Sequence, residues 1–318
     1  MKIAKKLRAW FQRDQRDLPW RHTRDPYAIW LSEIMLQQTR VAAVIPYYRR
    51  FLAKFPDYHT LAAAPEAELL AAWAGLGYYS RARNLQKSAQ MMVASGGFPS
   101  THEGILALAG VGVYTAGAVA SIAFGLPEVG IDGNVIRVLS RVTGGMADLR
   151  AAAVREMDRT DPGSYQQALM ELGATICLPR NPKCLLCPVS LDCKAHALGI
   201  EETLPVKAAK PAKIDEDKVI FWIVRDGSLL LWQRPAASRR LAGFWELPES
   251  GTIVGVKAGQ EIASFKHSIV NHRYTFTLRF GSLSGKITGD FVWVPLEKLP
   301  TMPASTVLRK SLALTSRI

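Results

Sequence analysis

All four cysteines of the 318-residue chain fall between positions 177 and 193, with the spacing C-x6-C-x2-C-x5-C. Because the rest of the chain contains no cysteine, four unrelated buried thiols are a poor explanation of this cluster. Clustered thiols in a cytosolic protein indicate a metal site rather than disulfides. Zinc and an iron–sulfur cluster both accept four thiolates. This segment is therefore expected to fold as a loop in which four sulfur atoms meet: Cys177, Cys184, Cys187 and Cys193.

Up to about residue 200, apolar periodicity and capping residues predict helices, and no strand is convincing. Asp25 and Pro26 suit the start of a helix over DPYAIWLSEIMLQQT. Thr39 is expected to cap the next helix, and Ser100 with Glu103 has capping-box spacing before a third. The basic N-terminus predicts a short amphipathic helix.

A change of composition divides the chain. Residues 199–217 are polar and rich in Lys, Ala and Pro, which predicts a linker. Strand-like segments follow it, and Asp226-Gly227 is expected to form a hairpin turn. The sequence thus predicts a helical domain over 1–198 and a smaller α+β domain over 218–318.

The chain is strongly basic, with a net charge of +13. Residues 1–216 hold 26 basic and 20 acidic residues, a net of +6, and residues 217–318 hold 14 and 7, a net of +7. Both parts therefore suit a polyanion such as nucleic acid. No apolar run approaches the roughly 20 residues of a membrane helix, and no signal peptide is evident. We expect an intracellular protein that does not enter membranes.

Two acids stand in unusual positions. Glu33 interrupts a helix of residues that a protein would bury, with Gln37 one turn later on the same side. Asp132, in the IDGN segment, precedes another helix. Each has an ordinary explanation, a partnered core acid for Glu33 and a helix cap for Asp132. The GVG turn at 110–112 is by itself weak evidence for a phosphate site.

Six motifs taken together are more specific. They are LPWR (18–21), LSEIMLQQT (31–39), GLGYYSRARN (75–84), LAGVGVYTAG (108–117), IDGN (131–134) and the cysteine loop. In this order the chain, over residues 18 to 195, resembles the MutY family of adenine DNA glycosylases, within the helix-hairpin-helix or endonuclease III superfamily. Ala109 stands where the family's hairpin usually has proline.

The resemblance implies a multidomain fold. An all-α helix-hairpin-helix glycosylase core with an iron–sulfur cluster loop is joined to an α+β, Nudix-like C-terminal domain. The core would comprise a six-helix module over about 23–130 and an iron–sulfur module of 1–22 plus 131–198, in which the four cysteines hold a [4Fe–4S] cluster. The expected partner is double-stranded DNA with adenine opposite 8-oxoguanine. A nucleoid-associated cytoplasmic protein, monomeric by default, is expected.

The resemblance also assigns catalytic roles. Glu33 would protonate the adenine leaving group at N7, and Asp132 would stabilise an oxocarbenium-like sugar, by its charge or through a transient covalent adduct. Asn134 and Tyr114 would line the same pocket. Glycoside cleavage requires such a pair of carboxylates, and burial would keep Glu33 protonated near neutrality. Since tyrosine at 114 replaces the Schiff-base lysine of bifunctional relatives, the family match implies a monofunctional glycosylase.

Further residues are assigned to DNA and base binding. Gln38, Leu76 and Tyr78 would enter the base stack while adenine is flipped out, although ordinary packing also explains Leu76 and Tyr78. The remaining residues of this set are Arg21, Gly110, Gly112, Asn271 and His272.

The segment RRLAGFWELPESG (239–251) resembles the Nudix-like domain of the family. Residues 217–318 contain only seven acids and no metal-binding acidic box, which predicts a recognition module rather than a pyrophosphatase. Val270-Asn271-His272 stands where the family usually has the Phe-Ser-His motif that reads 8-oxoguanine, so Asn271 and His272 are expected to replace it. A hairpin with exposed polar residues is the alternative.

Three rival functions are considered. One is a glycosylase for oxidised pyrimidines or thymine mismatches, which Tyr114 and the C-terminal domain oppose. Another is a non-catalytic iron–sulfur DNA-binding protein, which the presence of both Glu33 and Asp132 opposes. The third is a nucleotide hydrolase, opposed by the missing acidic box.

Overall fold

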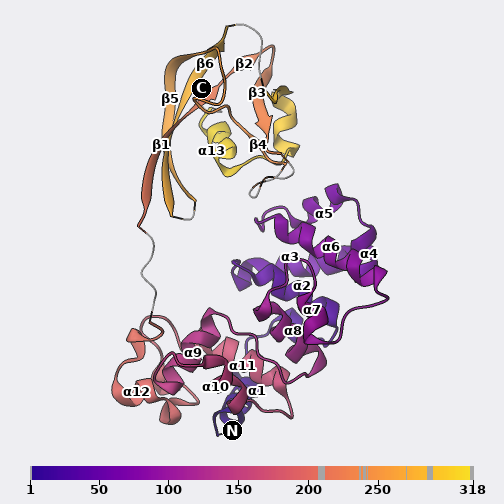
Figure 1. The fold of residues 1–318 in the computed structure, drawn as a ribbon, viewed down its shortest axis with the longest axis vertical. Coiled ribbons are helices and arrows are strands. Elements are labelled where there is room, and N and C mark those ends of the chain that lie inside the picture. Colours follow the sequence, from indigo (N-terminus) through magenta and orange to yellow (C-terminus); the bar gives the residue numbers. More distant parts are fainter. Residues whose placement is uncertain are drawn as a thin grey trace. The chain divides into compact units, whose positions relative to one another are not determined.

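The computed structural model describes residues 2–206, 212–235, 238, 241, 243–269, 271–284 and 289–315. The chain divides into two compact units, Met1–Ala208 and Ala209–Ile318, and each is described by itself (Figure 1). Three expectations fall partly outside the described residues: the middle of the linker at 207–211, Arg239, Arg240 and Ala242 of the Nudix-like segment, and Val270.

The described part of the first unit is helical throughout, as the sequence predicts. Its α-helices are α1 (Lys2–Asp14), α2 (Pro26–Leu36), α3 (Val41–Lys54), α4 (Tyr58–Ala63), α5 (Glu66–Trp73), α6 (Ser80–Ala94), α7 (His102–Leu106), α8 (Val113–Phe124), α9 (Gly133–Thr143), α10 (Leu149–Glu156), α11 (Pro162–Thr175) and α12 (Lys194–Leu198). Short 3-10 turns are η1 (Pro19–Arg21), η2 (Cys184–Leu186), η3 (Ser190–Asp192) and η4 (Glu201–Thr203).

Helix α2 begins as its sequence predicts. The Asp25 side chain accepts hydrogen bonds from the backbone N–H groups of Tyr27 and Ala28, and Pro26 occupies the first helical position, where no N–H is needed. Nine consecutive residues of α2, from Tyr27 to Met35, are buried. Glu33 is therefore carried into the interior on a helix that is buried along most of its length.

Two hydrophobic clusters form the core of this unit. The first runs from Leu18 to Ile122, and the second joins residues 3–11 of α1 to residues between Val129 and Val189. Two residues that precede the predicted module boundary at residue 22 pack with the residues that follow it. Leu18 and Trp20 pack in the first cluster, where the Trp20 ring meets Tyr48 edge-on with centroids 5.4 Å apart.

Two predicted caps are corrected. Arg40, not Thr39, precedes α3, and it makes no side-chain cap. The Thr39 hydroxyl instead accepts a hydrogen bond from Arg81. Thr101, not Ser100, caps α7, by accepting from the Gly104 N–H at 3.1 Å.

The second unit is α+β, as predicted. Its elements are β1 (Ile214–Trp222), β2 (Val224–Arg225), β3 (Ser228–Gln233), β4 (Trp245–Glu246), β5 (Val256–Ile269), β6 (His272–Leu283), β7 (Phe291–Pro295), η5 (Leu296–Thr301) and α13 (Thr306–Thr315). One sheet has the order β1-β6-β5, with β1 parallel and β5 antiparallel to β6; in the other, β3 pairs with β2, β4 and β7. Side chains from both sheets and Leu308 of α13 share one hydrophobic cluster.

The predicted Asp226-Gly227 turn is confirmed. Both residues have positive φ, 47° and 67°, between the antiparallel strands β2 and β3, which is the backbone that a two-residue hairpin requires. The predicted linker is too long, because η4 (Glu201–Thr203) still packs on the first unit and β1 already begins at Ile214.

Candidate functional site

A cleft of about 490 Å³ opens in the helical unit between the two hydrophobic clusters. Its walls come from α2, α8, α11 and the start of α9, which contact one another (Figure 1). The four residues expected to act in catalysis all line it: Glu33, Tyr114, Asp132 and Asn134. The structure therefore brings together side chains from segments that lie about a hundred residues apart in the sequence.

Glu33 is only 4% exposed. Burial raises the pKa of Glu33 to about 7; the hydrogen bond from Tyr114 opposes this shift and the charge of Asp132 adds to it. The Tyr114 hydroxyl donates to Glu33 Oε2 at 2.8 Å and lies 3.9 Å from the sulfur of Met170. The result is a carboxyl group that retains its proton near neutrality while facing a cleft.

Asp132 combines a structural role with a place in the cleft. Its Oδ1 accepts from the Val135 N–H at 2.7 Å, which caps α9, and its Oδ2 accepts from Asn134 Nδ2 at 3.0 Å. Arg137 in turn donates to Asn134 Oδ1 at 2.8 Å. The cap that the sequence suggested and the cleft-facing carboxylate are thus the same group.

Close backbone packing sets Tyr114 beside Asp132. A Cβ on Gly130 would lie 2.6 Å from the Tyr114 carbonyl oxygen, and one on Gly117 would lie 2.7 Å from that of Val129. Such distances are too short for any side chain, so only glycine lets α8 approach the segment that leads to Asp132.

The hairpin between α7 and α8 turns at Gly110. Gly110 has φ of 73°, and a Cβ there would lie 2.5 Å from Asn84 Nδ2. Gly112 begins α8 with no side-chain cap. The residue at the N-cap therefore supplies no side-chain acceptor to the first N–H groups of α8, and a Cβ on Gly112 would meet nothing within 4 Å.

The expected stack-entering residues differ in exposure. Gln38 is exposed and Tyr78 is 60% exposed, and both have left-handed backbones with φ of 57° and 50°. Leu76, by contrast, is 7% exposed and packs in the first hydrophobic cluster. Of these three residues, Gln38 and Tyr78 have side chains at the surface of the protein, and Leu76 does not.

Sequence reasoning missed Glu171, a third acid of the cleft, on α11. Burial alone would raise its pKa, but hydrogen bonds from Arg16 and Arg21 prevail and lower the pKa of Glu171 to about 2. Arg21 Nη2 donates to Glu171 Oε2 at 2.7 Å, and its side chain is nearly buried. Arg21, expected to bind DNA or the base, is thus engaged by Glu171 at the cleft wall. The only local signal for Glu171 is an acid within an apolar helix.

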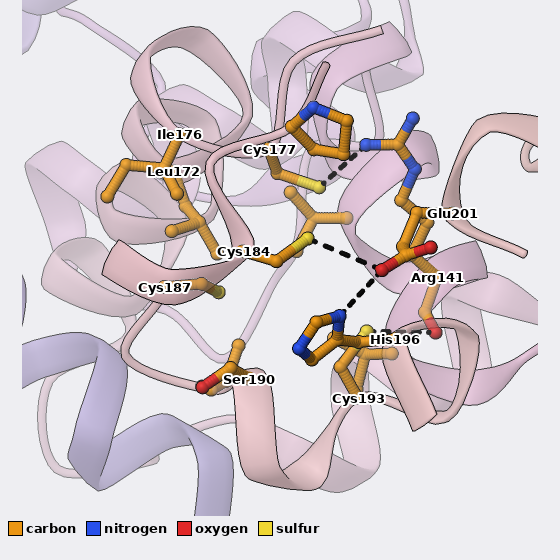
Figure 2. A pocket seen from close by; sticks show the side chains of 14 residues that line it. Arg141, Leu172, Ile176, Cys177, Cys184, Cys187, Ser190, Cys193, His196 and Glu201 are labelled. Carbon is orange, nitrogen blue, oxygen red and sulfur yellow. Dashed lines mark hydrogen bonds and ion pairs between the residues drawn. The ribbon is translucent and has the colours of Figure 1, made fainter. Parts of the chain in front are cut away.

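The four cysteine side chains surround one small cavity, as Figure 2 shows. Burial raises the pKa of Cys184 to about 11 and of Cys187 to about 12, and their neighbouring thiols add to both shifts. Arg141 donates to the Cys177 sulfur at 3.3 Å, and its carbonyl lies 3.3 Å from the Cys193 sulfur. Four converging thiols, among which burial disfavours ionisation of Cys184 and Cys187 on their own, fit a site in which bound metal stabilises the thiolates.

His196 and Glu201 lie at the edge of this cavity (Figure 2). His196 Nδ1 is 2.6 Å from Glu201 Oε1, which lies 3.6 Å from the Cys184 sulfur. The ligand atoms of these three residues lie within 4.8 Å of one another, a spacing that a metal ion also accepts. No sequence pattern indicated His196 or Glu201 at this site.

In the second unit, Asn271 and His272 form the end of the β5–β6 hairpin. The Asn271 carbonyl accepts from the Ile214 N–H at 2.9 Å. His272 Nδ1 contacts Glu216 on β1, and its ring stacks on Tyr274 with centroids 5.7 Å apart. Both residues are thus held by backbone or side-chain contacts to neighbouring strands.

Comparison with known proteins places this geometry in a family. Residues 31–157, which include Glu33, Tyr114, Asp132 and Asn134, match the HhH-GPD superfamily of base excision DNA repair proteins. An adenine DNA glycosylase of Buchnera aphidicola subsp. Baizongia pistaciae is 36% identical over 241 residues, covering 73% of this chain and 68% of that protein. The chain belongs to the adenine DNA glycosylase family. The human adenine DNA glycosylase is 45% identical over 307 residues, covering 76% of this chain and 56% of the human protein.

The chain spans about half the length of the mammalian and plant members of the family that it matches. Among solved structures, a thermostable thymine-DNA glycosylase is 31% identical with a TM-score of 0.58, covering 62% of this chain and 96% of that one. The helix-hairpin-helix glycosylase fold of the first unit is therefore confirmed. Among the described residues, no helix is both long and apolar enough to cross a membrane.

Proposed function

We propose that the chain is a monofunctional DNA glycosylase that excises adenine mispaired with 8-oxoguanine, or with guanine, in duplex DNA during base excision repair. The observation that carries the proposal is Glu33, a buried acid with a pKa of about 7 in the same cleft as Asp132. Adenine leaves as a neutral base only if a ring nitrogen is protonated, and the sugar left behind develops positive charge. A neutral acid and a carboxylate in one cleft suit these two demands.

In this mechanism Glu33 donates its proton to N7 of the flipped adenine. Tyr114 orients the Glu33 carboxyl through its 2.8 Å hydrogen bond, and having no amine it cannot attack the sugar as a Schiff-base nucleophile. Asp132, held by Val135 and Asn134, stabilises the oxocarbenium-like sugar. Water then completes the hydrolysis of the N-glycosidic bond.

The DNA would be held along one side of the helical unit. The N–H groups at the start of α8, beyond Gly110 and Gly112, suit a backbone phosphate. Gln38 and Tyr78 would enter the base stack when adenine leaves it, since aromatic side chains stack on any base. Leu76 would join them if DNA binding moves its loop, and Arg21 would shape the adenine pocket through Glu171.

The four cysteines would hold a [4Fe–4S] cluster, whose bonds to sulfur cross-link the loop from Cys177 to Cys193. The second unit would recognise 8-oxoguanine through Asn271 and His272. The expected active form is a monomer acting on chromosomal DNA in the cytoplasm.

One assay tests this function. Duplexes holding adenine opposite 8-oxoguanine, adenine opposite guanine, thymine opposite guanine, or oxidised thymine are incubated with the protein and then treated with alkali. We expect cleavage at adenine alone, and strand breaks only after alkali. Cleavage at thymine or oxidised thymine would favour the rival glycosylases, and intact adenine strands in every duplex would overturn the proposal.

The excision rate is expected to depend on the protonation of Glu33. Because its pKa is about 7, the acid is protonated below pH 7 and loses its proton as the pH rises through that value. The single-turnover rate should therefore be highest below pH 7 and fall by about tenfold for each further pH unit above it. A rate that stays constant from pH 6 to 9 would show that Glu33 is not the acid.

A further inference from the structure

Arg81, the second residue of α6, is a buried arginine that the proposed mechanism does not use. Its side chain is 8% exposed, and among the described residues no carboxylate forms an ion pair with it. Its two terminal nitrogens instead donate to oxygen acceptors, and its buried Nε has no hydrogen-bond partner. A buried charge is tolerated without an opposite charge only where such acceptors replace its water.

The acceptors belong to two separate segments. Arg81 Nη1 donates to the carbonyl oxygens of the last residues of α2 and beyond: Ile34 at 2.9 Å, Met35 at 2.9 Å and Gln37 at 2.6 Å. Arg81 Nη2 donates to the carbonyls of Leu76 and Gly77, each at 3.3 Å, and to the Thr39 hydroxyl at 3.2 Å. The carbonyl oxygens at the end of a helix have no N–H partner in their own helix. Arg81 supplies the N–H donors for those of α2 and at the same time binds the second segment.

Each segment carries one of the two exposed residues expected to enter the base stack. Gln38 follows Gln37, and Tyr78 follows Gly77. Both have positive φ, a conformation that non-glycine residues adopt only when their surroundings impose it. The Tyr78 ring also lies over the Arg81 guanidinium, with its centroid 5.4 Å from Cζ.

We propose that Arg81 is the positioning residue of the DNA wedge, defined as Gln38 and Tyr78. By joining the end of α2 to the loop before α6 through one rigid, planar group, it holds the two wedge residues at a fixed spacing. This inference rests on the proposed function, because the role of the wedge in base flipping is part of that proposal. It predicts that Arg81 governs extrusion of the adenine, whereas Glu33 governs cleavage of the bond.

Arg81→Lys tests the inference, because lysine keeps the positive charge but has a single nitrogen and cannot bridge both segments. The matched control is Arg83→Lys, two residues further along α6, where Arg83 is paired with Glu66 at 2.7 Å near the surface. Extrusion is followed by the fluorescence of 2-aminopurine placed beside the target adenine, in a Glu33→Gln background that does not cleave. Excision is followed as a single-turnover rate on two substrates: a duplex with adenine opposite 8-oxoguanine, called the paired duplex, and a duplex with adenine in a single-nucleotide bulge.

We expect Arg81→Lys to lose most of the fluorescence rise and to slow excision from the paired duplex by about 10²-fold. Excision from the bulge should fall less than about tenfold, because the base there is already unpaired and needs little extrusion. Arg83→Lys should match the wild type in both assays. A full fluorescence rise in Arg81→Lys, or equal losses on both substrates, would overturn the inference.

A thermal melt accompanies each variant. If Arg81→Lys does not fold, Thr39→Val replaces it; this variant removes one acceptor and should cause a smaller loss of the same kind, confined to the paired duplex. An unchanged extrusion signal in Thr39→Val would then count against the inference. If the wild-type chain excises adenine from no substrate, the proposed function fails and the wedge role fails with it. If the wild type excises adenine and Arg81→Lys does so equally well, the inference about Arg81 is wrong while the proposed function stands.

Discussion

Replacing Glu33 with glutamine is expected to lower the single-turnover rate of adenine excision by about 10²–10⁴-fold, the range of general-acid contributions. Glutamine has nearly the same shape, and its amide oxygen can still accept the 2.8 Å hydrogen bond from Tyr114. What the variant lacks is a proton to donate to the leaving base. Binding of the mispaired duplex, measured by fluorescence anisotropy, should remain within about threefold of the wild type, since Glu33 lies inside the cleft.

The melting temperature separates catalysis from packing in this experiment. Because the pKa of Glu33 is higher in the folded chain, about 7, than its ordinary value near 4.5, folding disfavours its charged form at neutral pH. Glutamine removes that unfavourable term, so the melting temperature at pH 7.5 should stay the same or rise. Glu68→Gln, at an exposed pair with Lys54, is the control for activity. If the Glu33→Gln protein has a lower melting temperature and still excises adenine, Glu33 contributes to stability and is not the catalytic acid.

Local sequence signals predicted those features that depend on neighbouring residues. The Asp25 cap of α2, the Asp226-Gly227 turn and the Asp132 cap each need only a few adjacent residues, and all three agree with the structure. The cysteine cluster was evident because its members lie close together in the chain. The meeting of Glu33 with Asp132, about a hundred residues away, was expected only through the resemblance to a family.

Features that depend on distant partners were missed. Arg81 donates to backbone carbonyls at 34–37 and 76–77, and every residue has a backbone carbonyl, so no residue type in the sequence indicates these contacts. The partner of Arg21 in the cleft wall, Glu171, lies 150 residues further along the chain. Strand β5 was predicted only in part, as one arm of the alternative hairpin. All of its residues are exposed or half-buried, so little apolar alternation appears, and its register is set by β6.

The two roles of Asp132 can be separated by Asp132→Asn. Asparagine is as good a helix cap as aspartate, and its side-chain oxygen can still accept from the Val135 N–H, so α9 should remain capped. Its amide nitrogen cannot accept from Asn134 Nδ2, so the half-buried hydrogen bond between these two side chains is the only one that the variant loses. It carries no negative charge, however, and a positive sugar would lose its stabilising partner. We expect the single-turnover rate to fall by at least about 10²-fold, the size of effect seen when one preorganised electrostatic group is removed, with the melting temperature nearly unchanged.

The matched control is Asp161→Asn, which makes the same change at the cap of α11, where Asp161 accepts from the Ser164 N–H at 3.1 Å outside the cleft. That variant should keep both its stability and its activity. If the two variants excise adenine equally fast, the charge of Asp132 has no part in the reaction and the residue is only a cap. If Asp132→Asn alone loses activity while it melts like the wild type, the cap fixes the carboxylate in position and the charge acts on the sugar.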